Sequence, residues 1–418
     1  MMIRANVRVI QAHFKKRQRA LQSQGITDPR SARGKRYSLA RVWRTALLSL
    51  CLLSQSTRRA VAVGRDLPGR MVCRIGRTAL SDLVSRLDPG EVRRKLYAQV
   101  HEEFHRKSLR PLGLPVGVVA IDGKTVWTGD EKVNEFCQRS HQEDGTPYWH
   151  FRVVRAVLVS GAAPVCIDQM PIRADTNDMG VLPAFLDALK RQYDKGRLFE
   201  VLTMDAGFCS QANARLVHDA HYAYVFGLKG NQPDLHEEAR RVLIPLADRT
   251  PPMAASDWEH ERGKRVQRRF WRTTDLAGWL DWSHLRQVWL VRRVEQRDGE
   301  PERVVDERLF VTNLPVARLN PRQCLEVVRR HWRIENHCYG TLDLQWKEDA
   351  GHWTRKGNGL LVCSLLRILA YNVLWLLKAV YFRADRHRRL PWLQLRDLVR
   401  DALILPGTRF GGLARAGA

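Results

Sequence analysis

Cysteine is scarce in this sequence: the 418 residues contain eight cysteines and no Cys-x-x-Cys pair. This spacing excludes a disulfide framework and a zinc ribbon and indicates free thiols in a reducing compartment. Acidic residues are also few, because 44 Asp and Glu oppose 70 Lys and Arg and leave a formal charge of +26. Such an excess favours a polyanionic partner, either nucleic acid or an anionic membrane surface.

Long hydrophobic runs are rare as well. No uninterrupted apolar stretch follows Arg4 and Arg8, so we expect no secretory signal. The one stretch of membrane-spanning length, residues 360–382, contains Arg367, Asn372 and Lys378. These polar residues favour a buried amphipathic helix over a membrane span. We therefore expect a cytoplasmic protein with no membrane partner.

The positive charge is concentrated in residues 1–110, which hold 25 Lys and Arg against 7 Asp and Glu, or +18 of the +26. We predict a basic N-terminal arm over residues 1–36, although a merely solvated tail has the same composition. Apolar residues at helical spacing predict a helix over 39–50, with Ser38 as its N-cap, and a second helix over 78–87. The sequences Asp66-Leu67-Pro68-Gly69 and Asp88-Pro89-Gly90 are expected to break the chain.

Arginines surround the second of these helices: Arg70, Arg74, Arg77 and Arg86. Short helices, a turn and clustered arginines are typical of a DNA reader of the helix-turn-helix kind, although any basic helical bundle gives the same pattern. We accordingly expect residues 37–110 to form a small DNA-binding region, with Arg70, Arg74 and Arg77 as candidate DNA contacts.

The middle of the chain alternates strand and helix patterns. Apolar runs predict three strands, then a helix, a strand, a helix and a strand, over residues 116–121, 149–159, 164–172, 179–193, 199–204, 211–220 and 222–228. This order is typical of an α/β fold in which sequential antiparallel strands precede parallel ones. Residues 111–256 would form the first part of this core, and the strand-rich residues 257–315 an insertion within it.

Two aspartates close predicted strands: Asp122 follows the first strand and Asp205 the fourth, each beside a glycine-containing turn. Strand ends in an α/β sheet are where such folds present reactive side chains. Each aspartate could instead simply cap its turn, as Asp often does.

A third carboxylate is predicted on a helix that begins at Asn320-Pro321. One helical face carries Leu325, Val328, Trp332, Glu335, Tyr339 and Leu342, which is apolar except for the glutamate. A buried carboxylate needs a cationic partner, so we expect a metal ion, Arg330 or His331 beside Glu335. This helix lies in residues 316–384, the second part of the core, and residues 385–418 are expected to form a basic C-terminal tail.

Together, Asp122, Asp205 and Glu335 form a set of hard oxygen ligands suited to Mg²⁺ or Mn²⁺. Two such ions can serve phosphodiester displacement. Glu348 or Asp349 could replace Glu335 as third ligand. A nearby group matches no zinc signature: His331, His337, Cys338 and His352.

Several short motifs occur in an order that resembles the insertion-sequence transposases of the DDE superfamily, in the branch that includes the H-repeat-associated proteins. They are Asp28-Pro29-Arg30 through Arg36-Tyr37, Ala120-Ile121-Asp122-Gly123-Lys124, Thr203-Met204-Asp205-Ala206, Lys229-Gly230-Asn231-Gln232, Arg330-His331-Trp332-Arg333-Ile334-Glu335-Asn336, Glu348-Asp349-Ala350 and Arg355-Lys356-Gly357-Asn358. The ordered set covers nearly the whole chain.

This resemblance implies an RNase H-like mixed-sheet catalytic core with a β-rich insertion, preceded by a small basic helical domain. It implies that Asp122, Asp205 and Glu335 form the catalytic triad and bind two Mg²⁺ or Mn²⁺ ions. Related transposases carry a tyrosine, an arginine and a lysine around the glutamate, with the lysine seven residues beyond it. Here that position is Leu342, and the residue four before the glutamate is His331, so we do not transfer phosphate-contact roles to these positions. Basic residues near the motifs are further candidate DNA contacts: Lys124, Lys229, Arg330 and Arg333.

The expected function is therefore a transposase that hydrolyses phosphodiester bonds at transposon ends and transfers the 3′-hydroxyl strand into target DNA. Its partners would be double-stranded DNA, comprising terminal inverted repeats and target, and at least a second copy of the chain on DNA. A metal-dependent nuclease without strand transfer would share the triad. A non-catalytic nucleic-acid-binding protein would share the charge but leave Glu335 unexplained.

Overall fold

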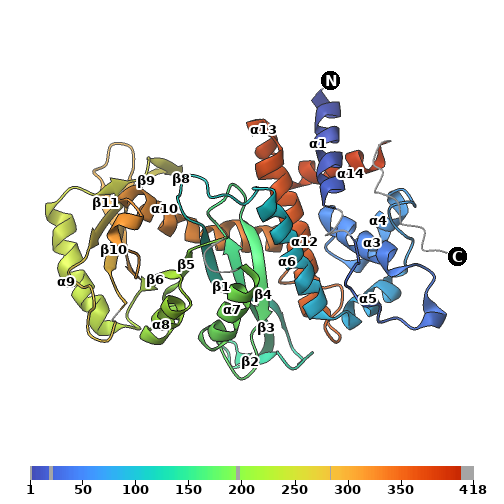
Figure 1. Cartoon of the computed structure of the whole chain (residues 1–418), viewed down its shortest axis with the longest axis horizontal. Coiled ribbons are helices and arrows are strands. Elements are labelled where there is room, and N and C mark those ends of the chain that lie inside the picture. Colours follow the sequence, from blue (N-terminus) through green and yellow to red (C-terminus); the bar gives the residue numbers. More distant parts are fainter. Residues whose placement is uncertain (1, 18–21, 194–197, 283, 406–418) are drawn as a thin grey trace.

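The computed structural model describes residues 2–17, 22–193, 198–282 and 284–405, and it places the described chain in three neighbouring regions (Figure 1). One region, here called the helical front, contains α1 Met2–Lys16, the short 3-10 turn Ala32–Gly34, α3 Leu39–Cys51, α4 Thr57–Asp66, α5 Arg77–Arg86 and α6 Pro89–His105. A mixed sheet with its helices occupies the centre, and a second group of strands lies on the side away from the helical front.

The central region confirms the predicted α/β, RNase H-like fold class. Its strands are β1 Val118–Gly129, β2 Gln138–His141, β3 Pro147–Leu158, β4 Val165–Pro171, β5 Val201–Met204 and β6 Ala223–Leu228. β3 pairs antiparallel with β1 on one side and with β2 and β4 on the other, whereas β1, β5 and β6 run parallel. Helices α7 Asp178–Tyr193 and α8 Gln211–Asp219 form the crossovers between the parallel strands.

The additional strands extend this sheet. After α9 Pro233–Arg249 come β7 Ala254–Ala255, β8 Glu259–Glu261, β9 Lys264–Thr273, β10 Gln287–Gln296 and β11 Arg303–Thr312. β11 pairs antiparallel with β6, so the strands form one eleven-stranded sheet. The strand-rich segment is therefore joined to the core sheet through residues 309–312 of β11, which pair with residues 225–228 of β6.

The chain then returns to the core in a series of helices: the 3-10 turn Val316–Arg318, α10 Pro321–His331, a π-helical turn Ile334–Tyr339, α11 Gly340–Trp346, α12 Gly359–Leu376, a second π-helical turn Leu377–Tyr381, α13 Asp385–Arg388 and α14 Trp392–Ile404. α10 starts as expected, because Asn320 and Gln323 cap each other's backbone amides in a capping box.

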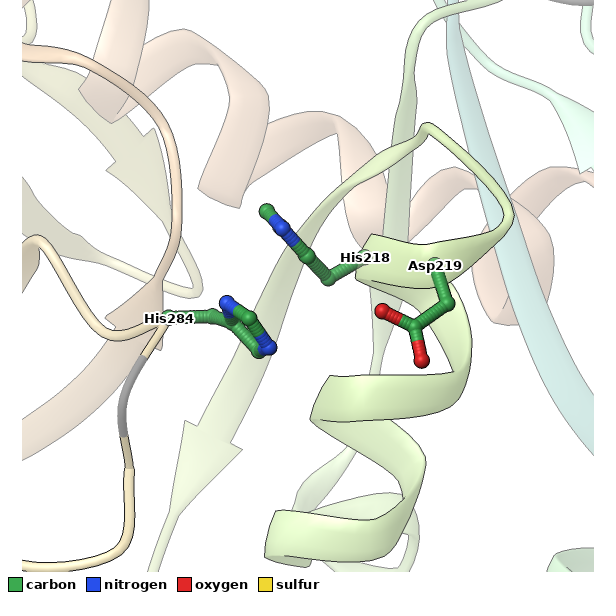
Figure 2. A group of neighbouring side chains, drawn as sticks. All are labelled: His218, Asp219 and His284. Carbon is green, nitrogen blue, oxygen red and sulfur yellow. The ribbon is translucent and has the colours of Figure 1, made fainter.

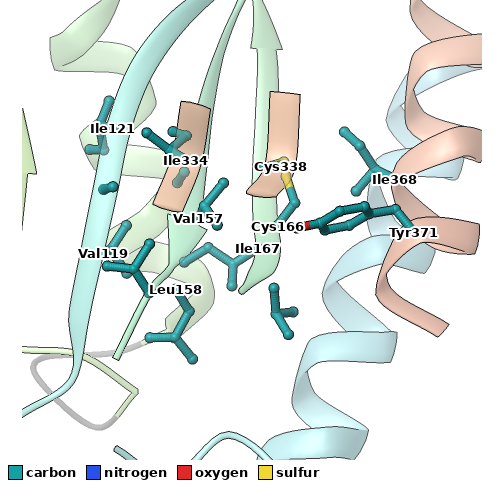
Figure 3. Packing of buried hydrophobic residues seen from close by; sticks show 14 of the residues in the cluster. Val119, Ile121, Val157, Leu158, Cys166, Ile167, Ile334, Cys338, Ile368 and Tyr371 are labelled. Carbon is teal, nitrogen blue, oxygen red and sulfur yellow. The ribbon is translucent and has the colours of Figure 1, made fainter. Parts of the chain in front are cut away.

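Helix α12 is the hydrophobic centre of the molecule. It packs against α3, α5 and α6 of the helical front and against β4 and β1 of the sheet. Figure 3 shows Ile368 and Tyr371 of α12 beside the sheet and the π-helical turn that carries Ile334 and Cys338. The segment Gly359–Tyr381 is long and apolar enough to cross a membrane, but it is buried inside the protein on nearly all sides rather than amphipathic. The helical front and the sheet therefore share one core.

The two chain ends differ from the predicted arm and tail. α1 buries Val7, Ile10 and Phe14, and Arg17 forms a fully buried salt bridge with Glu103 of α6. α14 buries one apolar face and packs on α1. Both segments were read as an arm and a tail because they contain many basic residues. Their apolar faces were missed because only every third or fourth residue of such a helix faces the core. Part of both predictions, residues 1, 18–21 and 406–418, lies outside the described residues.

The helical front also contains helices that the sequence reading missed. α4 lies between the two predicted helices, and α6 begins at Pro89, so Asp88-Pro89-Gly90 ends one helix and starts the next; Asp88 Oδ1 caps the amide of Glu91 at 2.7 Å. The connection from α4 to α5 spans residues 67–76, which is longer than the three- or four-residue turn of a helix-turn-helix motif. The connection from α3 to α4 is shorter and spans residues 52–56, so the helix-turn-helix character of residues 37–110 stays a prediction.

Candidate active site

Two aspartates stand side by side at the edge of the parallel pairing. β1 and β5 pair from Val118 with Val201 to Ile121 with Met204, so Asp122 and Asp205 occupy the next position on adjacent strands. Asp205 follows the end of β5, as predicted. Asp122 does not end its strand, because β1 continues to Gly129 against β3. Asp122 therefore stands where β1 loses one neighbour and keeps the other, which opens one side of the strand.

Glu335 comes from the π-helical turn after α10. The predicted continuous face is broken there: Ile334 and Cys338 are buried against the sheet, while Glu335 is exposed. A π turn accommodates an extra residue and rotates the following side chains, and such turns recur at functional sites. The periodicity of a regular α-helix had placed the glutamate on the apolar face. It instead faces an open surface.

Two hydrogen bonds hold this turn over the aspartates. Four residues before Glu335, the imidazole Nδ1 of His331 pairs with Thr203 Oγ1 of β5 at 3.0 Å. Four residues after it, the Tyr339 hydroxyl donates to the carbonyl oxygen of Asp122 at 2.9 Å. Each bond ties one end of the Glu335 segment to one of the two strands that carry the aspartates.

The three carboxylates repel one another. Burial, together with the negative charges of Asp205 and Glu335, raises the pKa of Asp122 to about 7. Burial raises the pKa of Asp205, and the charge of Asp178 adds to it. Burial and Asp205 also raise the pKa of Glu335, against the opposing effect of the Arg308 guanidinium. A divalent cation would relieve this repulsion.

The expected protein cations do not neutralise Glu335. Burial, with a contribution from Arg308, lowers the pKa of His331 to about 4, so its imidazole is neutral. Arg330 pairs instead with Glu326 and donates to the carbonyls of Ser160 and Leu112. Within the described residues, Glu335 has no ion pair with either Arg330 or His331; the cationic side chain that lowers its pKa is Arg308.

The Lys229-Gly230-Asn231-Gln232 motif supports Asp205. Asn231 Nδ2 donates to the carbonyls of Ala206 and Cys209 at 2.8 and 3.1 Å, and Gln232 also donates to Cys209. These bonds fix the 3-10 turn Ala206–Phe208 that follows the aspartate. Lys229 is exposed at the same place, and its ammonium opposes the burial-driven rise in the pKa of Asp205.

The other basic residues predicted near the site are occupied by protein groups. Lys124 Nζ forms an ion pair with Asp343 Oδ2 of α11 at 2.5 Å. Arg333 donates to the carbonyls of Val159, Gly161 and Ala162 and so closes the loop after β3. Together with Arg330, these side chains brace the site in this structure, and their nitrogen donors face protein rather than solvent.

Arg70, Arg74 and Arg77 are all exposed on the α4–α5 connection and the start of α5. Within the described part of the chain, none of the three has an ion pair or a side-chain hydrogen bond. They lie in the helical front and not at the carboxylates, so the structure does not bring these two sets of predicted residues together.

Glu348 cannot replace Glu335. Its carboxylate is fully buried and binds both terminal nitrogens of Arg155 at 2.8 and 2.6 Å, and it also accepts from Ser364 of α12. Arg155 is the direct cross-strand neighbour of Asp122 and lies 5.5 Å from the ring centre of Tyr339. This network was missed because Arg155 gives no signal in an otherwise apolar strand. The Arg155–Glu348 ion pair thus lies next to Asp122 in the sheet and stabilises the strand that carries it.

The sequence reading also missed a cluster away from the triad, formed by His218, Asp219 and His284 (Figure 2). Among the described residues, only these three offer ligand atoms that all lie within 4.8 Å of one another. However, the two imidazoles stack in parallel at 3.7 Å, so their in-plane lone pairs do not converge on one point. Asn313 Nδ2 contacts His218 Nδ1 at 3.2 Å, and its own orientation is fixed by Tyr224 and Tyr222. A single-ion site is not supported there.

The triad does fit divalent metal ions. Its donors are all carboxylate oxygens, as Mg²⁺ and Mn²⁺ prefer. Bound divalent ions would offset the mutual repulsion of the three carboxylates.

A mixed RNase H-like sheet with two aspartates after adjacent parallel strands and a glutamate on the helical turn beside them is the arrangement that the resemblance to DDE transposases implies. The model of the transposase DDE domain family matches residues 115–373, which include all three acidic residues. The chain belongs to this family of transposases.

Individual relatives are distant. The chain is 28% identical over 203 residues to the "Uncharacterized protein in dhlA 3'region" of Xanthobacter autotrophicus, covering 47% of this chain and 59% of that protein. It is 25% identical over 270 residues to the "H repeat-associated putative transposase YhhI" of Escherichia coli K12, covering 62% and 64%. The matches thus span about three fifths of the length of these relatives.

Among solved structures, the chain is similar to the piggyBac transposase in its synaptic complex with hairpin DNA, with 11% identity and a TM-score of 0.44. The similarity covers 90% of this chain and 74% of that one. A likeness at this level adds nothing to the family match.

Proposed function

We propose that this protein is a DNA transposase that cleaves phosphodiester bonds at transposon ends and joins the released 3′-hydroxyl strand to target DNA. The observation that carries the proposal is the convergence of Asp122, Asp205 and Glu335 from two adjacent strands and a π-helical turn, in a chain of the DDE transposase family. Asp122, Asp205 and Glu335 would hold two Mg²⁺ or Mn²⁺ ions.

When bound, two ions supply a deprotonated nucleophile and stabilise the leaving oxygen of an in-line displacement at phosphorus. The protein's own contribution is to hold the three carboxylates in position. His331 and Tyr339 fix the Glu335 segment, Asn231 and Gln232 fix the turn after Asp205, and the exposed Lys229 offers positive charge to a phosphate. Cleavage and strand transfer are both displacements at phosphorus, so one site can serve both.

The exposed arginines of the helical front would bind the DNA backbone, since phosphate contacts supply much of the affinity of a basic protein. Two transposon ends must be held together for transposition, so we propose at least a dimer on DNA. The DNA substrates would be the terminal inverted repeats and the target duplex.

The test is the Asp205→Asn substitution, assayed on DNA carrying the inverted repeats that flank the gene. Asn keeps the size of Asp but removes the charge that holds a cation, so cleavage and strand transfer should both be abolished while end binding persists. Asp187→Asn, at an exposed position of α7, is the matched control and should retain full activity. Normal cleavage by Asp205→Asn in Mg²⁺ would reject the mechanism.

The two rival functions give different products. A nuclease without strand transfer would nick the ends and never join them to target DNA. A non-catalytic binding protein would leave the DNA intact with the unsubstituted chain, under conditions in which binding is measured.

A further inference from the structure

Gly123 lies inside β1, where no turn requires a glycine. An ideal Cβ built on it would lie 2.1 Å from Oδ1 of Asp178 and 2.9 Å from Nη2 of Arg152. Side-chain carbons do not approach other atoms so closely, so any larger residue would displace this ion pair. Glycine is needed here because a carboxylate packs directly against the strand beside Asp122.

Asp178 is the first residue of α7, and its Oδ2 pairs with Arg152 of β3 at 2.6 Å. Its other oxygen, Oδ1, is buried and accepts no hydrogen bond from the described residues. Capping of α7 does not explain this placement, because Asn177 Oδ1 already accepts from the amide of Gly180 at 3.0 Å. Burying a carboxylate oxygen without a hydrogen-bond donor costs free energy of folding, so a function for Asp178 Oδ1 other than capping is indicated.

Asp178 lies beside the strand that carries Asp122, because its carboxylate packs against Gly123, the next residue of β1. Its charge acts on both Asp122 and Asp205, whereas the groups that act on Glu335 are Asp205 and Arg308. α7 also packs against the 3-10 turn that follows Asp205. Asp178 and Glu335 thus approach the two strand aspartates from different elements, α7 and the π-helical turn.

We propose that Asp178 is a fourth carboxylate of the divalent-cation site, and that Arg152 is its counter-charge when no ion is bound. The inference rests on the proposed metal-dependent function and extends its ligand set beyond the triad. Ion binding would draw Asp178 away from Arg152 and leave that guanidinium, about one quarter exposed, beside the site. There it could pair with a phosphate of the DNA.

The first test is a calorimetric titration of the full chain with Mn²⁺ alone, without DNA. Asp178→Asn should lower the Mn²⁺ affinity by at least about tenfold. Gly123→Ala should act in the same direction, because the new Cβ displaces the Asp178 carboxylate. Arg152→Gln should leave the affinity unchanged or raise it, because Asp178 is then free. Asp175→Asn is the matched control, since Asp175 is an exposed aspartate paired with Arg173 in the preceding loop.

The second test uses a soft metal. Asp178→Cys should bind Cd²⁺ with the ultraviolet absorption of a thiolate–cadmium bond, because thiolates prefer soft ions. The unsubstituted chain is the blank, since all eight of its cysteines are buried. If Asp178 affected the site only through its charge and did not contact the ion, the Asp178→Cys variant would show no such absorption band.

A purely structural Arg152–Asp178 pair predicts another pattern: Asp178→Asn and Arg152→Gln would lower stability alike and leave Mn²⁺ affinity unchanged. That pattern, or an Asp178→Cys variant without the cadmium band, would overturn the proposal. Asp205→Asn distinguishes a failure of the fourth ligand from a failure of the proposed metal site as a whole. If it abolishes Mn²⁺ binding while Asp178→Asn does not weaken it, only the fourth ligand fails; if it leaves binding intact, the proposed site itself fails.

Discussion

Asp122 is a residue whose environment opposes its charge. Its pKa is raised to about 7 by burial and by Asp205 and Glu335, against about 3.8 for an ordinary aspartate. Because the folded-state pKa lies above that of the unfolded chain, the protonated form stabilises the fold. This stabilisation is complete below about pH 4 and is lost as the pH rises through about 7.

We therefore predict that Asp122→Asn stabilises the metal-free protein at pH 8, by at most about 4 kcal/mol. The gain should shrink at pH 5 and vanish near pH 4, because Asp122 of the unsubstituted chain is then protonated. Urea unfolding at each pH measures it. Added Mn²⁺ should raise the stability of the unsubstituted chain at pH 8 far more than that of the variant. A variant that is less stable at pH 8 would show that the site does not strain the fold.

Exposed arginines supply a second prediction at the residue scale. Replacing Arg70, Arg74 and Arg77 together by Ala should weaken DNA binding and reduce the slope of log K against log salt by about 0.9 for each lost phosphate contact. The matched control replaces three exposed arginines of α7, α8 and α9, namely Arg191, Arg215 and Arg249, with the same change in net charge. Equal slopes for the two variants would show that net charge, and not the α4–α5 surface, governs binding.

At the scale of elements, the π-helical turn determines where Glu335 lies. Tyr339→Phe removes only the hydrogen bond to the Asp122 carbonyl, so we predict a loss of about 1 kcal/mol in stability and a fall of about tenfold to a hundredfold in the cleavage rate. Tyr381→Phe is the control, because it removes a comparable hydroxyl that contacts Ser108 and Glu103 away from the site. Similar cleavage rates in the two variants would mean that this bond does not position the glutamate.

The sequence predicted most core strands, because buried strands are continuous apolar runs. It singled out Asp122 and Asp205 as polar residues after such runs, which is correct for the end of β5, whereas β1 continues past Asp122 to Gly129. It misplaced the face of Glu335, since a π turn has no distinct sequence pattern and α-helical periodicity was assumed. It missed Asp178 and Arg155 for another reason. Their importance comes from which elements lie beside them, and pairing between β1, β3 and α7 is not encoded in local spacing.

At the scale of the whole molecule, the front of the chain is not an independent unit. α3, α5 and α6 bury their apolar faces against α12, which lies more than 250 residues later in the sequence. We predict that a fragment of residues 1–110 has no cooperative urea transition by circular dichroism, whereas the full chain does. A cooperative transition in the fragment, together with salt-dependent DNA binding, would show that the helical front folds without α12.

The late position of α12 in the sequence also determines when the helical front can complete its folding during synthesis on the ribosome. The arginine-bearing helices are synthesised before α12, and the surface that completes them follows only after the segment that carries Glu335. Until residue 376 has left the ribosomal tunnel, α3, α5 and α6 lack the apolar surface of α12 on which they pack. A chain released early would therefore lack the completed helical front. If this region binds DNA as proposed, incomplete products would not compete with finished molecules for the same DNA.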